Sequence, residues 1–271
     1  MMPLDKRVFS MISFFSSYKL SYAVPAVFRP RSDWMIGEKI KALTFDTGGT
    51  ILDWHSGFYN ALSKTGEKYG MKKDWHTIAN ELRRRSLGKI LNQGEVKKPK
   101  HNFDEAHKVV LDELCDEYRL NKFSKEDRQF IAWTAPHNFK VWEDFPEVLP
   151  ELKKKFICCS FTILSFRIIV DTARKNGLSW DAVFSCEAIG KYKILPAPYQ
   201  TVAKWLQLEP NEICMVACHN FDLNAAKAVG FKTAFVKRPD EWGPAGPPDP
   251  EPNPDHDIIV DTFPDLARKL L

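Results

Sequence analysis

The chain has 271 residues, of which 44% are hydrophobic and 27% are charged, and its formal net charge is +4. These values are typical of an ordinary soluble globule, long enough for one large domain or for a core domain with a smaller cap. The charge is modest and the Lys and Arg residues are scattered, so we expect no nucleic-acid partner. We also expect no membrane span, because no segment reaches the roughly 18 apolar residues that one needs.

The first 34 residues differ from the rest of the chain. They are rich in serine, aromatic and basic residues, and only Asp5 and Asp33 are acidic. This composition is typical of an organellar transit peptide, although an upstream start codon explains it equally well because Met35 stands just before the first predicted strand. We therefore treat residues 1–34 as an extension outside the fold. We expect a cytoplasmic protein, or a mitochondrial one if the extension is a genuine transit peptide.

The first strand predicted along the chain ends in a group of polar and small residues. An apolar run from Ile40 reaches Phe45 and then gives way to Asp46, two glycines and Thr50. A buried parallel strand delivers a side chain in this way to the carboxyl edge of a sheet, where open α/β folds bind their ligands. The glycines allow a sharp turn and a close approach of the backbone to a ligand.

A helical pattern then continues for about ninety residues. Apolar spacing predicts helices near 58–70, 78–94 and 106–114, and Ser124 is an N-cap candidate for a fourth helix that runs toward Trp133. The chain is expected to return to the core near Phe145. We therefore expect a helical cap over residues 55–144.

Strands and helices alternate in the remainder of the chain. Strands are expected at 156–161, 182–186, 213–217, 233–236 and 257–260, separated by helices at 168–176, 198–206 and 223–229 and by a Pro-rich loop at 239–254. Repeated β-α units of this kind predict an α/β fold with a Rossmann-like, doubly wound parallel sheet. Residues 35–54 and 145–271 would form this core. The six cysteines show no zinc spacing and have strand-like neighbours, so we expect small, reduced core residues rather than disulfides or a structural metal.

Polar side chains stand at several of the predicted strand ends. Because the ends of parallel strands share one edge of a sheet, residues far apart in sequence can meet there. An ordered set of carboxylate, hydroxyl, lysine and carboxylate is stronger evidence for a site than any one member. The set comprises Asp46 with Thr50, Ser160 or Thr162, Lys193, and the group His219, Asn220 and Asp222.

Four motifs that contain these residues resemble those of the haloacid dehalogenase superfamily, and within it the type II (L-2-haloacid) dehalogenases. They are FDTGGTILD at 45–53, FICCSFT at 156–162, YKILPAPY at 192–199 and MVACHNFDLNAAKAVGFKTAFVKRP at 215–239. The helical insert also lies where that family carries its cap. The resemblance implies an (S)-2-haloacid dehalogenase-like hydrolase that breaks a carbon–halogen bond in a short 2-haloacid through an aspartyl ester, with no metal and no cofactor.

The resemblance also implies roles for individual residues. Asp46 would be the nucleophile, Thr50 would orient it, Lys193 would neutralise the accumulated negative charge, and Asp222 would position Lys193 or the hydrolytic water. A carboxylate nucleophile splits one difficult displacement into an ester-forming and an ester-hydrolysing step, and a nearby cation stabilises the developing charge.

Further residues would bind the substrate. Counting back from Gly177 favours Thr162 over Ser160 as the hydroxyl of the second motif. The cap arginine that grips the halide and the substrate carboxylate falls on Arg83, and because a helix turns about 100° per residue, its two neighbours cannot face the site equally well. His219 and Asn220 complete the set. For His219 a structural histidine bonded to the backbone is the alternative.

Departures from the family pattern leave other functions open. Dehalogenases usually carry an aromatic residue where this chain has Gly48, and an asparagine where it has Ile163. A Mg²⁺-dependent phosphatase needs an acid at position 48, and the fourth motif has only Asp222 as a carboxylate, so we expect no metal site. A phosphonatase would need a cap lysine as Schiff-base former, for which the candidates are Lys64, Lys68 and Lys89. A non-catalytic binding protein on the same fold is the rival from another class. We expect a small organic acid as partner, and a homodimer is left open.

Overall fold

The computed structural model describes residues 37–91, 102–247 and 250–271, and these residues belong to one compact unit. The predicted N-terminal extension, residues 1–34, lies outside the described residues, as does the helix end expected at Gly94. Among the residues that are described, no helix is long and apolar enough to cross a membrane.

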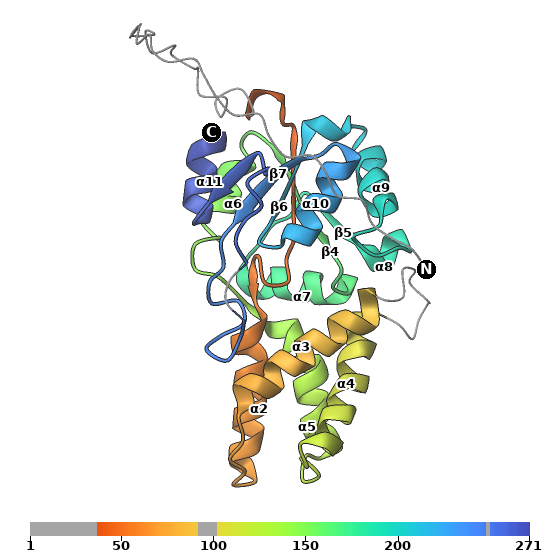
Figure 1. Cartoon of the computed structure of the whole chain (residues 1–271), viewed down its shortest axis with the longest axis vertical. Helices are drawn as coiled ribbons and strands as arrows, with labels where there is room; N and C mark the ends of the chain where they lie inside the picture. The colour runs from red at the N-terminus through yellow and green to blue at the C-terminus, as the bar shows by residue number, and fades with distance from the viewer. Residues whose placement is uncertain (1–36, 92–101, 248–249) are drawn as a thin grey trace, which may run out of the picture. The chain divides into compact units, whose positions relative to one another are not determined.

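Six parallel strands form the central sheet (Figure 1). Their spatial order is β5-β4-β1-β6-β7-β8, with β1 in the interior between β4 and β6. The strands are β1 (Ala42–Phe45), β4 (Ile157–Thr162), β5 (Ala182–Ser185), β6 (Ile213–Ala217), β7 (Lys232–Val236) and β8 (Ile258–Val260). Burial on both faces explains their continuous apolar sequences. The predicted α/β fold with a doubly wound parallel sheet is confirmed.

Helices cover both faces of this sheet. Side chains alternate along each strand, so β1 directs Leu43 and Phe45 into one core and Ala42 into the other. The first core is closed by α6 (Val148–Leu152) and α11 (Phe263–Leu270), and the second by α7 (Phe166–Asn176), α9 (Pro196–Leu206) and α10 (Asn220–Val229). A short helix, α8 (Cys186–Ile189), follows β5. All six cysteines are buried and free, as expected.

A second group of helices lies between β1 and α6 in the sequence and appears as a separate bundle in Figure 1. Ser124 caps the fourth helix as predicted, because its hydroxyl accepts the Asp127 N–H and the Asp127 carboxylate accepts the Ser124 N–H. The helices are α2 (Trp54–Lys68), α3 (Trp75–Leu91), α4 (Phe103–Glu117) and α5 (Lys125–Gln129), followed by a π-helical turn, η1 (Phe130–Thr134), and a 3₁₀ turn, η2 (Pro136–Asn138).

A small antiparallel ribbon joins this bundle to the sheet. It pairs β2 (Leu52–Asp53) with β3 (Lys140–Val141), where the chain leaves β1 and where it returns. The sequence analysis missed it, because two residues are too few to show a strand period. The boundaries proposed for the cap, at 55 and 144, stay a prediction, and the ribbon lies next to both of them.

Candidate active site

The Asp46 carboxylate lies at the carboxyl end of β1 and is 6% exposed. Its Oδ2 accepts a hydrogen bond from the Thr50 hydroxyl at 2.8 Å, and its Oδ1 lies 3.1 Å from the Lys193 ammonium. Burial favours the neutral acid, but Lys193 and His219 outweigh it and hold the pKa of Asp46 well below its ordinary value. A buried carboxylate that stays ionised can act as a nucleophile.

Lys193 bridges two carboxylates. Its Nζ lies 2.7 Å from Asp222 Oδ2 as well as 3.1 Å from Asp46, and the Tyr199 hydroxyl donates to Asp222 Oδ1 at 2.5 Å. Burial opposes the charge on Lys193, but the two carboxylates raise its pKa. The next residue, Ile194, has φ +71°, which a β-branched side chain rarely adopts. The backbone is therefore strained where it delivers this lysine.

The two hydroxyls considered for the second motif occupy different positions. Thr162, the last residue of β4, accepts a hydrogen bond from the Thr47 hydroxyl at 2.7 Å, directly beside Asp46, and another from the Leu164 N–H. The Ser160 hydroxyl is buried without a hydrogen-bond partner among the described residues. The structure therefore brings Thr162 to the nucleophile loop and leaves Ser160 in the interior of the sheet.

Arg83 reaches the nucleophile loop from α3. Its guanidinium donates to the Gly48 carbonyl at 3.2 Å and lies against the rings of Trp54 and Phe103. A Cβ atom at residue 48 would stand only 2.7 Å from Nη2 of Arg83. Gly48 therefore leaves room for this guanidinium to lie against the nucleophile loop.

His219 lies between two carboxylates. Its Nδ1 is 3.3 Å from Asp46 Oδ2, and its Nε2 is 3.1 Å from each oxygen of Glu241. These contacts are with carboxylate side chains, whereas the alternative considered from the sequence was a histidine bonded to the backbone. Burial disfavours the charged ring, but Cys218, Glu241 and Asp46 outweigh it and raise the pKa of His219 well above its ordinary value.

Glu241 is a site residue that the sequence analysis missed. It lies in the Pro-rich loop, is 4% exposed, and also accepts a hydrogen bond from the Trp54 indole. Arg238 fixes the start of this loop through a double contact with Asp144 and a bond to the Thr50 carbonyl. One of several acidic residues among prolines shows no local pattern, so only the fold reveals it.

Comparison with known proteins identifies the family. A model of the haloacid dehalogenase-like hydrolases matches residues 40–230, which is more than half of the chain. The chain belongs to the haloacid dehalogenase-like hydrolase family. The superfamily predicted from the four motifs is confirmed, and the protein is a hydrolase of this type.

Relatives within the family include L-2-haloacid dehalogenases. The (S)-2-haloacid dehalogenase 4A of Burkholderia cepacia is 23% identical over 207 residues, which cover 74% of this chain and 84% of the relative. The crystal structure of the L-2-haloacid dehalogenase PA0810 superposes with a TM-score of 0.77 at 28% identity and covers 86% of this chain and 100% of its own. That of the defluorinating L-2-haloacid dehalogenase Rha0230 has the same TM-score at 30% identity, with coverages of 85% and 95%.

The Asn220 side chain, expected to bind the substrate, has its hydrogen-bond partners elsewhere in this haloacid dehalogenase-like protein. Its amide nitrogen donates to the Glu251 carbonyl, and its oxygen bonds the Asn253 N–H and His256 Nε2. Both ends of the amide are thus engaged by residues 251–256, and none of these bonds reaches a site residue. Asn220 holds the Pro-rich loop against α10 instead.

The cap lysines considered for Schiff-base chemistry also point elsewhere. Lys68 pairs with Asp127, and Lys89 pairs with Glu113. Lys64 is exposed beside a pocket that none of the predicted site residues lines. A phosphonatase mechanism therefore lacks its nucleophile among these three residues.

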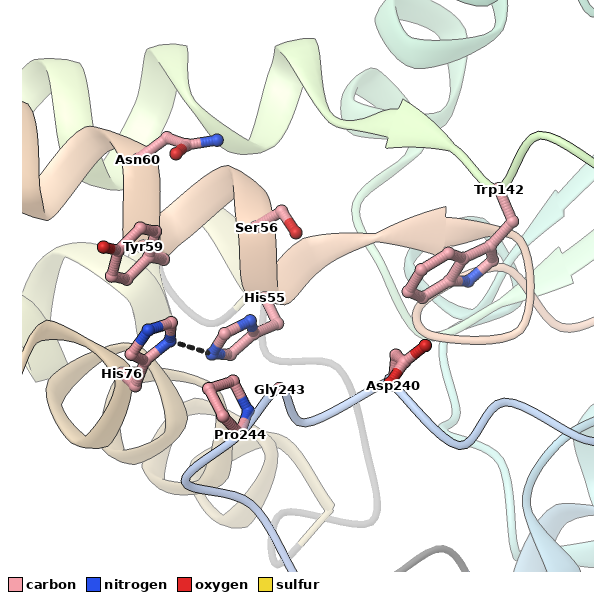
Figure 2. Close-up of a pocket in the computed structure, with 9 residues that line it drawn as sticks. All are labelled: His55, Ser56, Tyr59, Asn60, His76, Trp142, Asp240, Gly243 and Pro244. Carbon is pink, nitrogen blue, oxygen red and sulfur yellow. Dashed lines mark hydrogen bonds between the residues drawn. The ribbon is translucent and has the colours of Figure 1, made fainter.

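A cavity of about 460 Å³ lies beside the loop that carries Glu241. Figure 2 shows His55 and His76 at its wall, with ring nitrogens 3.3 Å apart, and Asp240 and Gly243 from the loop. Trp142, which follows β3, also lines it and donates to the Gly49 carbonyl. None of the site residues predicted from the sequence is among the residues that line this cavity.

The donor atoms in the site that could bind a divalent metal already have partners in the protein. The position between Asp46 and Asp222, which a cation could bridge, holds the Lys193 ammonium. Cys218, His219 and Glu241 have donor atoms within 4.8 Å of one another, but His219 and Trp54 already bond Glu241. Magnesium is usually held by one or two carboxylates together with waters and substrate phosphate, and the two carboxylates here are already bridged by Lys193.

Proposed function

We propose that this chain hydrolyses the carbon–halogen bond of short (S)-2-haloacids through an ester formed on Asp46. The observation that carries the proposal is the environment of Asp46: a buried, ionised carboxylate with Lys193 on one oxygen, Thr50 on the other and the Arg83 guanidinium over the same loop. The similarity to L-2-haloacid dehalogenases supports the same reaction class.

In the first step, an oxygen of Asp46 attacks C2 of the substrate from the side opposite the halogen, and the halide departs with the bonding electrons. Arg83 is the buried cation available to the substrate carboxylate or the departing halide, and its Nε has no hydrogen-bond partner among the described residues. A charge-assisted contact made in such a buried site is stronger than one in water.

In the second step, water attacks the Asp46 carboxyl carbon and releases the 2-hydroxyacid. Lys193 then neutralises the charge that develops on the carboxyl oxygen, because its Nζ already lies 3.1 Å from Oδ1. Asp222 holds Lys193 in place, and Tyr199 in turn holds Asp222. The hydrogen bond from the Thr50 hydroxyl, together with the one that the Asp46 N–H donates to the Val216 carbonyl, fixes the nucleophile itself.

The rival functions fit these contacts less well. A Mg²⁺-dependent phosphatase needs an acid at residue 48, where the Arg83 guanidinium occupies the space that a side chain would fill. A non-catalytic binding protein does not need a buried carboxylate kept ionised between a lysine and a histidine, which costs desolvation free energy.

The experiment that tests the proposal compares two activities of the purified protein. We expect halide release from (S)-2-chloropropionate that is unchanged by EDTA, because the site holds Lys193 where a metal would otherwise bridge the carboxylates. A panel of phosphate esters with Mg²⁺ serves as the parallel assay. Phosphate release that depends strictly on Mg²⁺, without halide release, would assign the chain to the phosphatase branch instead.

A further inference from the structure

The two ring nitrogens of His219 face different partners. Nε2 lies 3.1 Å from both oxygens of Glu241, whereas Nδ1 lies 3.3 Å from Asp46 Oδ2. An ionised carboxylate only accepts hydrogen bonds, so Nε2 must carry the hydrogen that bonds Glu241. When the ring is neutral, its lone pair is therefore on Nδ1 and faces the Asp46 carboxyl group.

Other groups around Asp46 cannot readily take a proton from water. The Lys193 ammonium has only donors, and the Thr50 hydroxyl donates to Asp46 while it accepts the Cys218 N–H. Asp222 is 1% exposed, and Lys193 and Tyr199 bond its two oxygens. The His219 side chain is more open, with 15% of its surface exposed, so water can approach it.

We propose that His219 is the general base for hydrolysis of the Asp46 ester and that Glu241 is its positioning residue. This inference rests on the proposed function, because it needs an ester on Asp46. The inference goes beyond that function because it assigns the proton transfer from water to His219, positioned by Glu241.

The resting charges fit this role. Before the reaction, the Asp46 and Glu241 carboxylates favour the protonated ring. When Asp46 becomes an ester it loses its charge, and the ring keeps only the Glu241 carboxylate as a close anionic partner. The ring then releases its proton to solvent, which accounts for the acid formed together with the halide.

Hydrolysis of the ester then returns each group to its starting state. Nδ1 takes a proton from water while the water oxygen bonds the Asp46 carboxyl carbon. The tetrahedral intermediate breaks its bond to the substrate oxygen, and the leaving alkoxide takes the proton from the ring. The new Asp46 carboxylic acid finally returns its own proton to the ring, which restores the starting charges. Glu241 keeps the ring oriented throughout.

The test is His219→Gln, which retains a polar side chain but removes the base. With excess (S)-2-chloropropionate we expect a burst of about one halide per site followed by turnover slowed by about 10²-fold. The intact protein should become heavier by one propionate group, and peptide mapping should locate it on Asp46. Glu241→Gln should show the same accumulation to a smaller extent, and this variant keeps the ring if His219→Gln does not fold.

His256→Gln is the matched control. His256 is also buried, and its Nε2 bonds Asn220 rather than a site residue, so near-normal turnover without ester is expected. Loss of the halide burst in folded His219→Gln, or slow turnover without ester in both site variants, would overturn this inference alone. Absence of halide release from the wild-type protein would overturn the proposed function and this inference with it.

Discussion

Asp46→Asn is expected to reduce halide release to the background rate. An amide is a poor nucleophile, and replacement of a covalent nucleophile in other hydrolases costs on the order of 10⁴- to 10⁶-fold in kcat. Lys193 keeps Asp222 as its partner in this variant, at 2.7 Å, so no unpaired buried charge is left behind. The variant should therefore fold, which a thermal melt would check.

Asp257→Asn is the matched control for this change. Asp257 is also a partly buried carboxylate paired with a lysine, Lys232, but it lies where β7 and β8 begin, at the opposite edge of the sheet from Asp46. We expect stability to fall modestly and turnover to stay near normal. If Asp46→Asn kept more than a small fraction of the halide release, Asp46 would not be the nucleophile.

Arg83→Ala is expected to lower kcat/KM for 2-chloropropionate by about 30- to 1,000-fold, which corresponds to about 2–4 kcal/mol of lost transition-state stabilisation. Arg83 is 3% exposed and its guanidinium lies over the nucleophile loop. Arg83→Lys should recover only part of the loss, because an ammonium cannot reproduce the planar fork of a guanidinium.

Arg84→Ala and Arg85→Ala serve as controls on the same helix. Arg84 pairs with Glu81 on the same helix, and Arg85 pairs with Glu81 and with Glu117 at the end of α4. Surface pairs contribute little to stability, and neither residue contacts the site, so changes below about threefold in kcat/KM are expected. Comparable losses at all three positions would show that Arg83 has no special role.

Much of this site could be predicted because parallel strands share one carboxyl edge. Asp46, Thr162 and Asp222 follow strands or begin the next helix, and the repeating β-α pattern is sufficient to bring them together with Lys193. Family motifs supplied the identities of these residues. Helical geometry alone was sufficient to predict that only one of the three consecutive arginines faces the site.

The parts that could not be predicted depend on contacts distant in sequence. Gly48 departs from the family pattern, and the Arg83 guanidinium from α3 lies where a side chain at that position would be. Glu241 contacts His219 from a loop whose start is anchored by the Arg238 contact with Asp144. The contacts of the Asn220 side chain with residues 251–256 are also not indicated by its position in the sequence.

The location of labelled oxygen after one turnover tests the central claim most directly. With enzyme in excess over (S)-2-chloropropionate in ¹⁸O-labelled water, the ester mechanism predicts that the label enters the Asp46 side chain, because water attacks its carboxyl carbon. The first 2-hydroxyacid released would carry an unlabelled oxygen from the enzyme. Label in the first product together with an unlabelled Asp46 would mean that water attacks the substrate directly, with Asp46 only as a base, and would contradict the covalent mechanism.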